Sequence, residues 1–258
     1  MAVALAAVEQ GAGPPVVILH GLFGAGRNWT MIAKRLAATH RVYALDLRNH
    51  GASPWADSMR YAEMAEDVRA FLQQHGMDRA TLLGHSMGGK VAMLTALCHG
   101  GRVDRLVVVD IAPVSYPPTY LPYVRAMRAV DLSASTRRSE IEEQLRGPVR
   151  NQMVRLFLLQ NLVAEDGRFR WRVNLPVLEE AMAGLSDFPE LPSDRTYGGP
   201  ALFIAGGRSA YVGEAQHPAI KRLFPSAEIV TLPEAGHWIH AEQPEAFLEI
   251  VRPFLGGS

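Results

Sequence analysis

The pentapeptide around Ser86 has the clearest chemical meaning in this sequence. It reads Gly84-His85-Ser86-Met87-Gly88, which matches G-x-S-x-G, and it lies between an expected strand and an expected helix, as this pattern requires. Such a sharp turn exposes a serine for nucleophilic attack, and the two glycines let the strand and helix pack closely. The Met87 N–H, at the helix start, can stabilise an oxyanion. We therefore predict Ser86 as a nucleophile; the alternative is an ordinary glycine-rich turn.

Two histidine-containing segments supply candidate partners for this serine. The first, 20–24 (HGLFG), follows the first expected strand, where serine hydrolases with this kind of turn place a second oxyanion N–H. We predict Leu22 as that donor, with Phe23 as the fallback and His20 as a structural histidine. Gly236-His237-Trp238 follows the last expected strand. His237 is the predicted general base, which takes the proton from the serine and later returns it to the leaving group.

The acid that would orient His237 is in an unusual place. In most proteins with this arrangement it follows the expected strand 202–205, but the loop 206–212 (GGRSAYV) has no carboxylate. Asp110 directly follows three valines at the end of a strand, at the sheet edge where sites collect, and a buried carboxylate needs a partner. We predict Asp110 as the acid; its alternative role is to cap the segment that follows. The rival carboxylates are Glu214 and, less well placed, Asp187 and Asp194.

Alternating short apolar runs and helical patterns must position these residues. Strands that are apolar throughout are typical of a sheet covered by helices on both faces, and this alternation predicts a mostly parallel α/β sheet. The stretch 46–53 (DLRNHGAS) is expected to be a structural turn. The predicted strands are 16–19, 42–45, 81–83, 106–109, 202–205 and 229–232, with a further strand near the N-terminus. The predicted core helices are about 28–38, 61–75 and 90–98, with a last helix from about 244.

The strand pattern stops for roughly eighty residues, which is too long for a bare loop. No buried strand is evident there, whereas 140–145 and 152–162 have helical patterns. We therefore predict an α/β core formed by 1–112 and 196–258, with 113–195 inserted as a helical lid over Ser86. Apolar side chains of the lid and nearby loops are candidate walls of an acyl pocket, although they can equally serve to hold the lid together. These candidates are Phe23, Met127, Leu158, Leu159, Leu162, Trp171, Tyr211 and Trp238.

The composition excludes several classes of function. The 26 basic residues balance the 26 acidic ones, so no overall charge favours nucleic acid or an anionic membrane. Cys98 is the single cysteine, so no intramolecular disulfide is possible; we expect an inert core thiol and a cytoplasmic location. We expect the apolar N-terminal residues to form a strand and not a signal peptide, and no apolar run approaches the roughly 20 residues that a membrane helix needs. Without an HExxH pattern or a close cluster of ligands, no metal or other cofactor is expected.

With Ser86, His237 and Asp110 in place, the chain resembles a group within the α/β-hydrolase superfamily, the YbfF-type esterases and the abhydrolase-domain-containing protein 11 group. The resemblance spans nearly the whole predicted core, and the insertion matches less. It implies the α/β-hydrolase fold, ester hydrolysis without a cofactor, and an acid at Asp110. The segments that carry it are 20–28 (HGLFGAGRN), 46–53 (DLRNHGAS), 84–90 (GHSMGGK), 109–113 (VDIAP) and 236–242 (GHWIHAE), with 170–178 (RWRVNLPVL) in the insertion.

These observations together predict a serine hydrolase. Its substrates would be small-molecule carboxylic esters or thioesters with short to medium acyl chains, cleaved through an acyl-enzyme intermediate. A serine at position 86, in place of aspartate, argues against epoxide hydrolase and haloalkane dehalogenase chemistry. A carbon–carbon bond hydrolase or an acyltransferase can use the same triad, and a small-molecule receptor can retain it without turnover.

Overall fold

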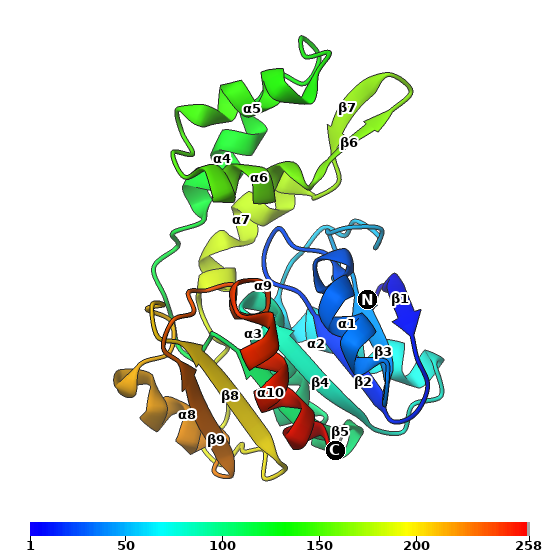
Figure 1. Ribbon diagram of the computed structural model, residues 1–258, viewed down its shortest axis with the longest axis vertical. Coiled ribbons are helices and arrows are strands. Elements are labelled where there is room, and N and C mark those ends of the chain that lie inside the picture. Colours follow the sequence, from blue (N-terminus) through cyan, green and yellow to red (C-terminus); the bar gives the residue numbers. More distant parts are fainter. Residues whose placement is uncertain (257–258) are drawn as a thin grey trace.

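A seven-stranded sheet forms the centre of the molecule (Figure 1), with the strand order β1-β3-β2-β4-β5-β8-β9. The computed structural model describes residues 1–256, so the last two residues of the predicted core range 196–258 lie outside it. β1 pairs antiparallel with β3, and every other pair of neighbours is parallel. The strands are β1 (Ala7–Gln10), β2 (Pro15–Leu19), β3 (Arg41–Leu45), β4 (Ala80–His85), β5 (Val103–Val109), β8 (Ala201–Gly206) and β9 (Ala227–Leu232).

Helices cover both faces of this sheet, which explains why its inner strands are apolar along most of their length. In β2, Val16 and Ile18 pack on the face that α1 and α10 cover. Val17 and Leu19 pack on the opposite face, with α2 and α3. The strand period of two residues thus divides one apolar run between two hydrophobic cores. The helices and 3₁₀ turns of the core are η1 (Gly26–Trp29), α1 (Thr30–Leu36), α2 (Tyr61–Gln74), α3 (Met87–Cys98), η2 (Gly100–Arg102), η3 (Glu214–Gln216), α8 (His217–Leu223), α9 (Ile239–Glu242) and α10 (Pro244–Leu255).

The predicted parallel α/β architecture is confirmed, and most of the predicted core elements differ from the observed ones by a few residues at their ends. The helix predicted over about 90–98 from its pattern starts at Met87, directly after Ser86, which agrees with the helix start expected at Met87. The prediction of Cys98 as a core thiol is wrong, because its side chain is exposed. Cys98 is the last residue of α3, where the helix leaves the sheet, and its apolar sequence neighbours face inward.

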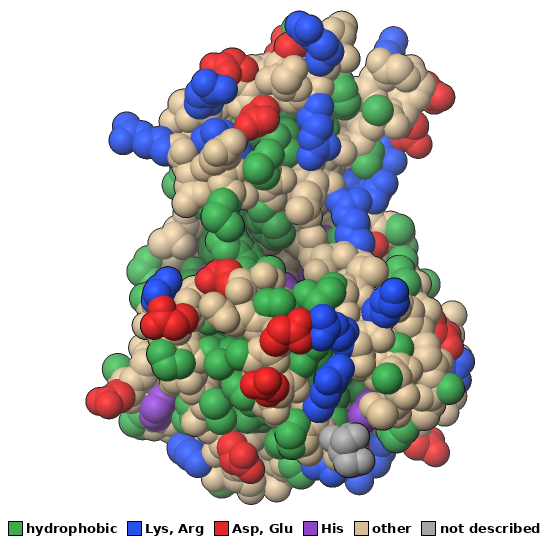
Figure 2. Space-filling model, in the orientation of Figure 1, with side chains coloured by type: hydrophobic (Ala, Val, Ile, Leu, Met, Phe, Trp, Pro, Cys, Tyr) green, Lys and Arg blue, Asp and Glu red, His purple; other side chains and the backbone are tan. Residues whose placement is uncertain are grey.

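The segment between β5 and β8 forms an insertion above the carboxyl ends of the strands (Figure 1). It has a hydrophobic core of its own, in which Met127, Leu145, Leu158 and Leu178 are fully buried. Figure 2 shows hydrophobic side chains gathered along the waist between this insertion and the sheet domain. The elements of the insertion are α4 (Leu121–Arg128), α5 (Arg138–Arg146), α6 (Gln152–Leu159), β6 (Leu162–Glu165), β7 (Arg168–Trp171) and α7 (Leu175–Ser186).

The hairpin of β6 and β7 was not predicted, because most of its residues are exposed or half-buried and give no apolar run. The sequence did contain a signal for it in Asp166-Gly167. Both residues have positive φ, 51° and 73°, as a two-residue type I′ hairpin turn requires. The insertion is therefore helical with one added hairpin.

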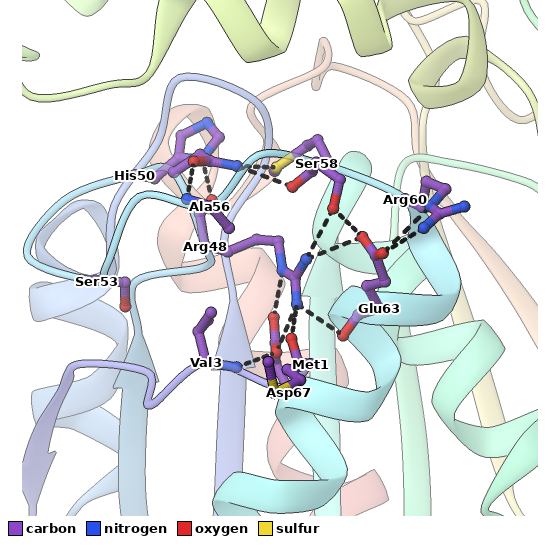
Figure 3. Close-up of polar contacts among 12 residues, drawn as sticks. Met1, Val3, Arg48, His50, Ser53, Ala56, Ser58, Arg60, Glu63 and Asp67 are labelled. Atoms are coloured by element: carbon purple, nitrogen blue, oxygen red, sulfur yellow. Dashed lines mark hydrogen bonds and ion pairs between the residues drawn. The ribbon is translucent and has the colours of Figure 1, made fainter.

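A buried ion-pair network anchors the turn 46–53 to α2 (Figure 3). The Arg48 side chain is 2% exposed and that of Asp67 is 1% exposed. The guanidinium donates from Nε to Asp67 Oδ2 at 2.6 Å and from Nη2 to Oδ1 at 2.8 Å. A third bond reaches Glu63 at 2.9 Å, and Asp67 also accepts the Val3 N–H at 2.7 Å. The network therefore ties the N-terminal segment, α2 and this turn together.

We expect Asp67→Ala to destabilise the fold, because it leaves the Arg48 guanidinium buried without its main partner. Removing one member of a buried ion pair costs about 3–5 kcal/mol, and urea unfolding followed by circular dichroism measures the loss. Glu66→Ala is the matched control on the same helix: its pair with Arg69 is half-exposed, and such pairs contribute at most about 1 kcal/mol. Equal losses in the two variants would contradict this account of the network.

Candidate active site

Ser86 lies on a strained turn between β4 and α3, with φ 51° and ψ −119°. Close packing makes the two flanking glycines necessary. A Cβ at Gly84 would lie 2.2 Å from the Gly88 carbonyl oxygen, and one at Gly88 would lie 2.3 Å from the Leu19 carbonyl oxygen. The Ser86 N–H donates to the Val109 carbonyl at 3.0 Å, which ties the turn to the end of β5. The structure thus holds the serine in a conformation that most residues avoid.

Ser86, His237 and Asp110 meet at the carboxyl edge of the sheet, although they come from three separate loops. His237 Nε2 lies 3.1 Å from Ser86 Oγ, and His237 Nδ1 lies 2.7 Å from Asp110 Oδ2. Because a carboxylate can only accept here, Nδ1 carries the proton and Nε2 is free to accept one from the serine. This is the geometry of a nucleophile, a base and the acid that orients the base.

The Asp110 carboxylate is fully buried, and three donors satisfy it. Besides His237, Oδ1 accepts the Gly206 N–H at 2.9 Å and Oδ2 accepts the Ser209 hydroxyl. Ser209 stands in the loop where most related arrangements carry the acid, and here it supports the acid from the neighbouring strand instead. A buried carboxylate would be costly without such donors.

The rival carboxylates are engaged elsewhere or exposed. Glu214 begins the 3₁₀ turn η3 and is exposed, as is Asp194. Asp187 accepts hydrogen bonds from the Ser115 hydroxyl and the Phe188 N–H. Of the carboxylates weighed from the sequence, the structure brings Asp110 to His237.

Leu22 and Met87, the predicted oxyanion donors, both line a cavity with Ser86. Met87 is the first residue of α3, so its N–H has no partner within the helix. Phe23, the fallback donor, has its N–H directed to His50 Nε2 at 3.2 Å. Leu22 therefore remains the better candidate of the two.

The turn 46–53 supports this oxyanion loop, a role that the sequence analysis did not assign to it. His50 accepts the Phe23 N–H, and the Leu47 N–H donates to His20 Nε2 at 3.0 Å. From the insertion, Asn161 Nδ2 donates to the Phe23 carbonyl at 2.8 Å. Core and insertion thus hold the two sides of the same peptide segment. The histidines of HGLFG and DLRNHG were the available signal for this contact.

Several buried histidines surround the triad in their neutral form. Burial lowers the pKa of His20 to about 4 and the pKa values of His50 and His240 to about 3. Burial, with His237 nearby, also lowers the pKa of His85. His85 Nε2 donates to the His237 carbonyl at 2.8 Å, so this neighbour of Ser86 holds the loop that carries His237.

Two cavities meet at Ser86, and they differ in their walls. The first runs between the sheet edge, the segment after β5 and α7; the second contains His237 and opens toward α6. The first is lined by Leu22, Tyr61, Ser86, Met87, Lys90, Ile111, Tyr116, Pro117, Thr119, Tyr120, Met182, Leu185, Ser186 and Tyr211. The second is lined by His20, Gly21, Leu22, Gly24, Asn28, Trp29, His85, Ser86, Tyr120, Phe157, His237, Trp238 and His240.

The predicted pocket residues divide into two groups. Tyr211 lines the first cavity and Trp238 the second. The others belong to the hydrophobic core of the insertion and line neither cavity, so they hold the insertion together. The walls of the first cavity come instead largely from α3, α7 and the proline-rich segment after Asp110, which the sequence analysis did not consider as pocket walls. Those of the second come mainly from residues 20–29 and 237–240. The residues in the core of the insertion are Phe23, Met127, Leu158, Leu159, Leu162 and Trp171.

No group of three or more His, Cys, Asp or Glu side chains among residues 1–256 is arranged to hold a metal ion. No helix in that same range is long and apolar enough to cross a membrane.

Comparison with known proteins agrees with the observed fold. A family model described as the alpha/beta hydrolase fold matches residues 14–244. The chain belongs to the α/β-hydrolase fold family. This α/β hydrolase is 43% identical over 254 residues to the sn-1-specific diacylglycerol lipase ABHD11 of Danio rerio, covering 95% of this chain and 80% of that protein.

Two further comparisons agree. Esterase YbfF of Escherichia coli (strain K12) is 37% identical to this α/β hydrolase over 250 residues, which cover 96% of each chain. The solved structure of a marine microorganism esterase matches with a TM-score of 0.95 and 38% identity, over 98% of this chain and 100% of that one. The predicted resemblance to both groups of relatives is confirmed.

The neutral histidines predict that this α/β hydrolase loses stability in mild acid. Their pKa values are near 6.5 when unfolded and are lowered in the folded state to about 4 for His20 and about 3 for His50 and His240. The unfolded chain therefore binds protons below pH 6.5 that the folded protein excludes, so stability present above that pH falls as pH decreases. Each such histidine lowers the free energy of unfolding by up to about 1.4 kcal/mol for each unit by which the pH falls.

Urea midpoints between about pH 7 and pH 5, above the range where most carboxylates titrate, measure this loss. His240→Phe is the matched variant, because His240 stacks on Trp29 at 3.9 Å and its buried Nδ1 has no hydrogen-bond partner in the described structure. The variant should keep the stacking and show a shallower loss in acid. A flat dependence in the parent protein would contradict the assignment of neutral histidines.

Proposed function

We propose that the protein is a serine hydrolase that cleaves carboxylic esters or thioesters with short to medium acyl chains through Ser86, His237 and Asp110. The observation that carries the proposal is the continuous line of hydrogen bonds from Asp110 Oδ2 through His237 to Ser86 Oγ, with spacings of 2.7 Å and 3.1 Å. The strained turn at Ser86 and the glycines beside it support the same assignment.

Ester hydrolysis as the general activity follows from the family and the relatives. The chain is an ester-hydrolysing enzyme, since proteins named as esterases and lipases match it at 34–44% identity over most of its length. The acyl group, the choice between ester and thioester, and the roles of single residues are the parts that we propose here. A cytoplasmic location stays a prediction.

The reaction would proceed in two halves. Ser86 Oγ attacks the carbonyl carbon while its proton moves to His237 Nε2, and the charge on the carbonyl oxygen is stabilised by the Leu22 and Met87 N–H groups. His237 then gives this proton to the leaving oxygen or sulfur, and the acyl group remains on Ser86. In the second half water attacks the acyl-enzyme, His237 again accepts and returns the proton, and a carboxylic acid leaves.

The two cavities divide the substrate between them. The leaving group must receive a proton from His237, which lines the second cavity. The acyl group then extends into the first cavity, past Leu22, Ile111, Met182 and Leu185. These apolar side chains suit a hydrocarbon chain, and the small size of the cavity that they share with four tyrosines limits its length.

Substitutions assayed on one soluble nitrophenyl ester test the assignment of the triad. Ser86→Ala and His237→Ala should abolish measurable turnover. Asp110→Asn should lower kcat by about 10⁴-fold, because the imidazole loses the partner that fixes its tautomer. Glu214→Gln is the matched control and should retain near-parental activity.

If Glu214→Gln were the damaging change, the acid would be wrongly assigned. Turnover that survives Ser86→Ala would remove the nucleophile from this mechanism. A folded parent protein without turnover on any ester would favour the receptor alternative. An acyl transfer product in the presence of alcohol, in preference to the free acid, would favour an acyltransferase.

A series of straight-chain acyl groups tests the size of the substrate. We expect kcat/KM to be highest for chains between butanoyl and octanoyl and to fall by about tenfold or more for palmitoyl, because α7 and the tyrosines close the first cavity. Nitrophenyl esters and the corresponding coenzyme A thioesters, measured at equal concentrations, give both the chain-length profile and the preference for oxygen or sulfur. A steady rise to palmitoyl would contradict the proposed chain length.

A further inference from the structure

A buried ammonium group lies in the wall of the first cavity. Lys90 is 1% exposed, whereas lysines are almost never fully buried unless they are paired. It lines the cavity together with Ser86, Met87 and Leu22. A lysine is therefore present where the acyl group of a substrate would lie, and the triad mechanism gives it no task.

The partners of Lys90 in the described part of the chain are neutral. Nζ donates to the carbonyl oxygens of Ser186 at 3.0 Å and Asp187 at 2.6 Å. It also lies 5.0 Å from the centre of the Tyr116 ring and 5.8 Å from that of Tyr61. The Asp187 carboxylate, the nearby negative charge, is itself held by Ser115 and by the Phe188 N–H.

In this environment the Lys90 ammonium contacts no anion directly among the residues that the structure describes, and its two hydrogen bonds leave one N–H donor free. An ammonium has three N–H donors, and two of them are directed to carbonyls at the carboxyl end of α7. Burial lowers the pKa of Lys90 to about 8, and the attraction of the Asp187 carboxylate opposes this only in part, so the group remains mostly protonated at neutral pH. An anionic ligand would both neutralise it and fill the third donor.

The position of Lys90 on α3 would bring an anion bound to its ammonium group close to the reacting carbonyl. Its N–H donates to the Ser86 carbonyl at 3.1 Å, so the two residues are one helical turn apart, with a rise of about 6 Å. Side chains on a helix point toward its N-terminus, which here carries the nucleophile. An anion on Nζ would therefore be separated from the ester carbonyl by only a few carbon atoms.

We propose that Lys90 is a specificity-determining residue that binds a second carboxylate on the acyl group, so that half-esters or half-thioesters of short dicarboxylic acids are preferred substrates. This inference rests on the proposed function, because it assigns the first cavity to the acyl side. Apolar side chains contact the methylene groups between the two carboxyl carbons, and the Lys90 ammonium forms a charge-assisted hydrogen bond with the terminal carboxylate.

A purely structural role for Lys90 is the alternative. Its bonds to Ser186 and Asp187 place a cation at the carboxyl end of α7, where the helix dipole favours positive charge, and they fasten the insertion to α3. That role would affect stability and the turnover of all substrates together. It would not make the enzyme distinguish a carboxylate from a neutral group of the same shape.

The test uses pairs of substrates that differ only at the end of the acyl chain. Monoethyl esters of succinic, glutaric and adipic acid are compared with neutral ethyl esters in which an isopropyl group replaces the carboxylate, and ethanol release is measured. We expect the parent enzyme to favour at least one half-ester over its neutral counterpart by roughly tenfold to a hundredfold in kcat/KM, as for a hydrogen bond to a charged group.

In Lys90→Met this ratio should fall by a similar factor, mainly through a higher KM for the half-ester. The ratio cancels any general loss of activity. Lys34→Met, a change at an exposed lysine on α1, is the matched control and should leave the ratio unchanged. If Lys90→Met does not fold, two measurements on the parent enzyme still test the proposal. One is its ratio of kcat/KM values for the half-ester and the neutral ester. The other is competitive inhibition, in which glutarate should bind more tightly than pentanoate.

The outcomes separate the two proposals. Hydrolysis of the neutral esters without any preference for a half-ester, or a ratio unchanged in Lys90→Met, would overturn the role of Lys90 and leave the hydrolase mechanism intact. A folded enzyme that cleaves neither class of ester would contradict the proposed function itself.

Discussion

The buried carboxylate of Asp110 is the group on which the arrangement of the site depends. It follows β5, and its donors come from the end of β8, the loop after β8 and the loop after β9. A charge without solvent is stable only if such donors converge on it. Three loops are therefore held at one edge of the sheet, and the His237 imidazole is oriented as one of the donors. The His237 imidazole is therefore positioned by one of the hydrogen bonds that stabilise the buried Asp110 carboxylate.

The choice of Asp110 in place of a carboxylate after β8 changes how the site is supported. Ser209 occupies that loop and directs its hydroxyl to the same Asp110 oxygen that contacts His237. Because β5 and β8 are adjacent parallel strands, their carboxyl ends lie side by side, and an acid can reach the imidazole from either one. The sheet therefore permits a carboxylate at the end of either strand to contact an imidazole in the same place.

The insertion and the core form the site jointly. Asn161 from the insertion and His50 from the core bind opposite sides of the Phe23 peptide segment, next to the proposed oxyanion donor Leu22. On the other side of the site, Lys90 of the core donates to the Ser186 and Asp187 carbonyls at the carboxyl end of α7. The insertion therefore contacts the loops on both sides of Ser86, and its α7 provides part of the wall of the first cavity. A shift of the insertion relative to the core would therefore change the shape of this cavity, whereas Ser86, Asp110 and His237 all belong to the core.

The sequence by itself determined the parts of this protein that depend on local order. The turn at Ser86, the parallel sheet, the place of His237 after the last strand and the carboxylate after three valines could all be inferred, since each follows from residue types within a few positions of one another. The absence of a carboxylate from residues 206–212, at the end of β8 and in the loop after it, also indicated that the predicted acid lies on another strand.

Only the tertiary structure decided which side chains surround Ser86. Most of the predicted wall residues pack inside the insertion, whereas Lys90, Tyr116 and Met182 line the cavity. Nothing in the sequence indicated that Asn161 reaches the Phe23 carbonyl. Apolar patterning reports that a side chain is buried but not which surface buries it. The contacts in question join residues that are tens to more than a hundred positions apart. Their pairing is set by how the insertion docks on the sheet, and no local pattern encodes that.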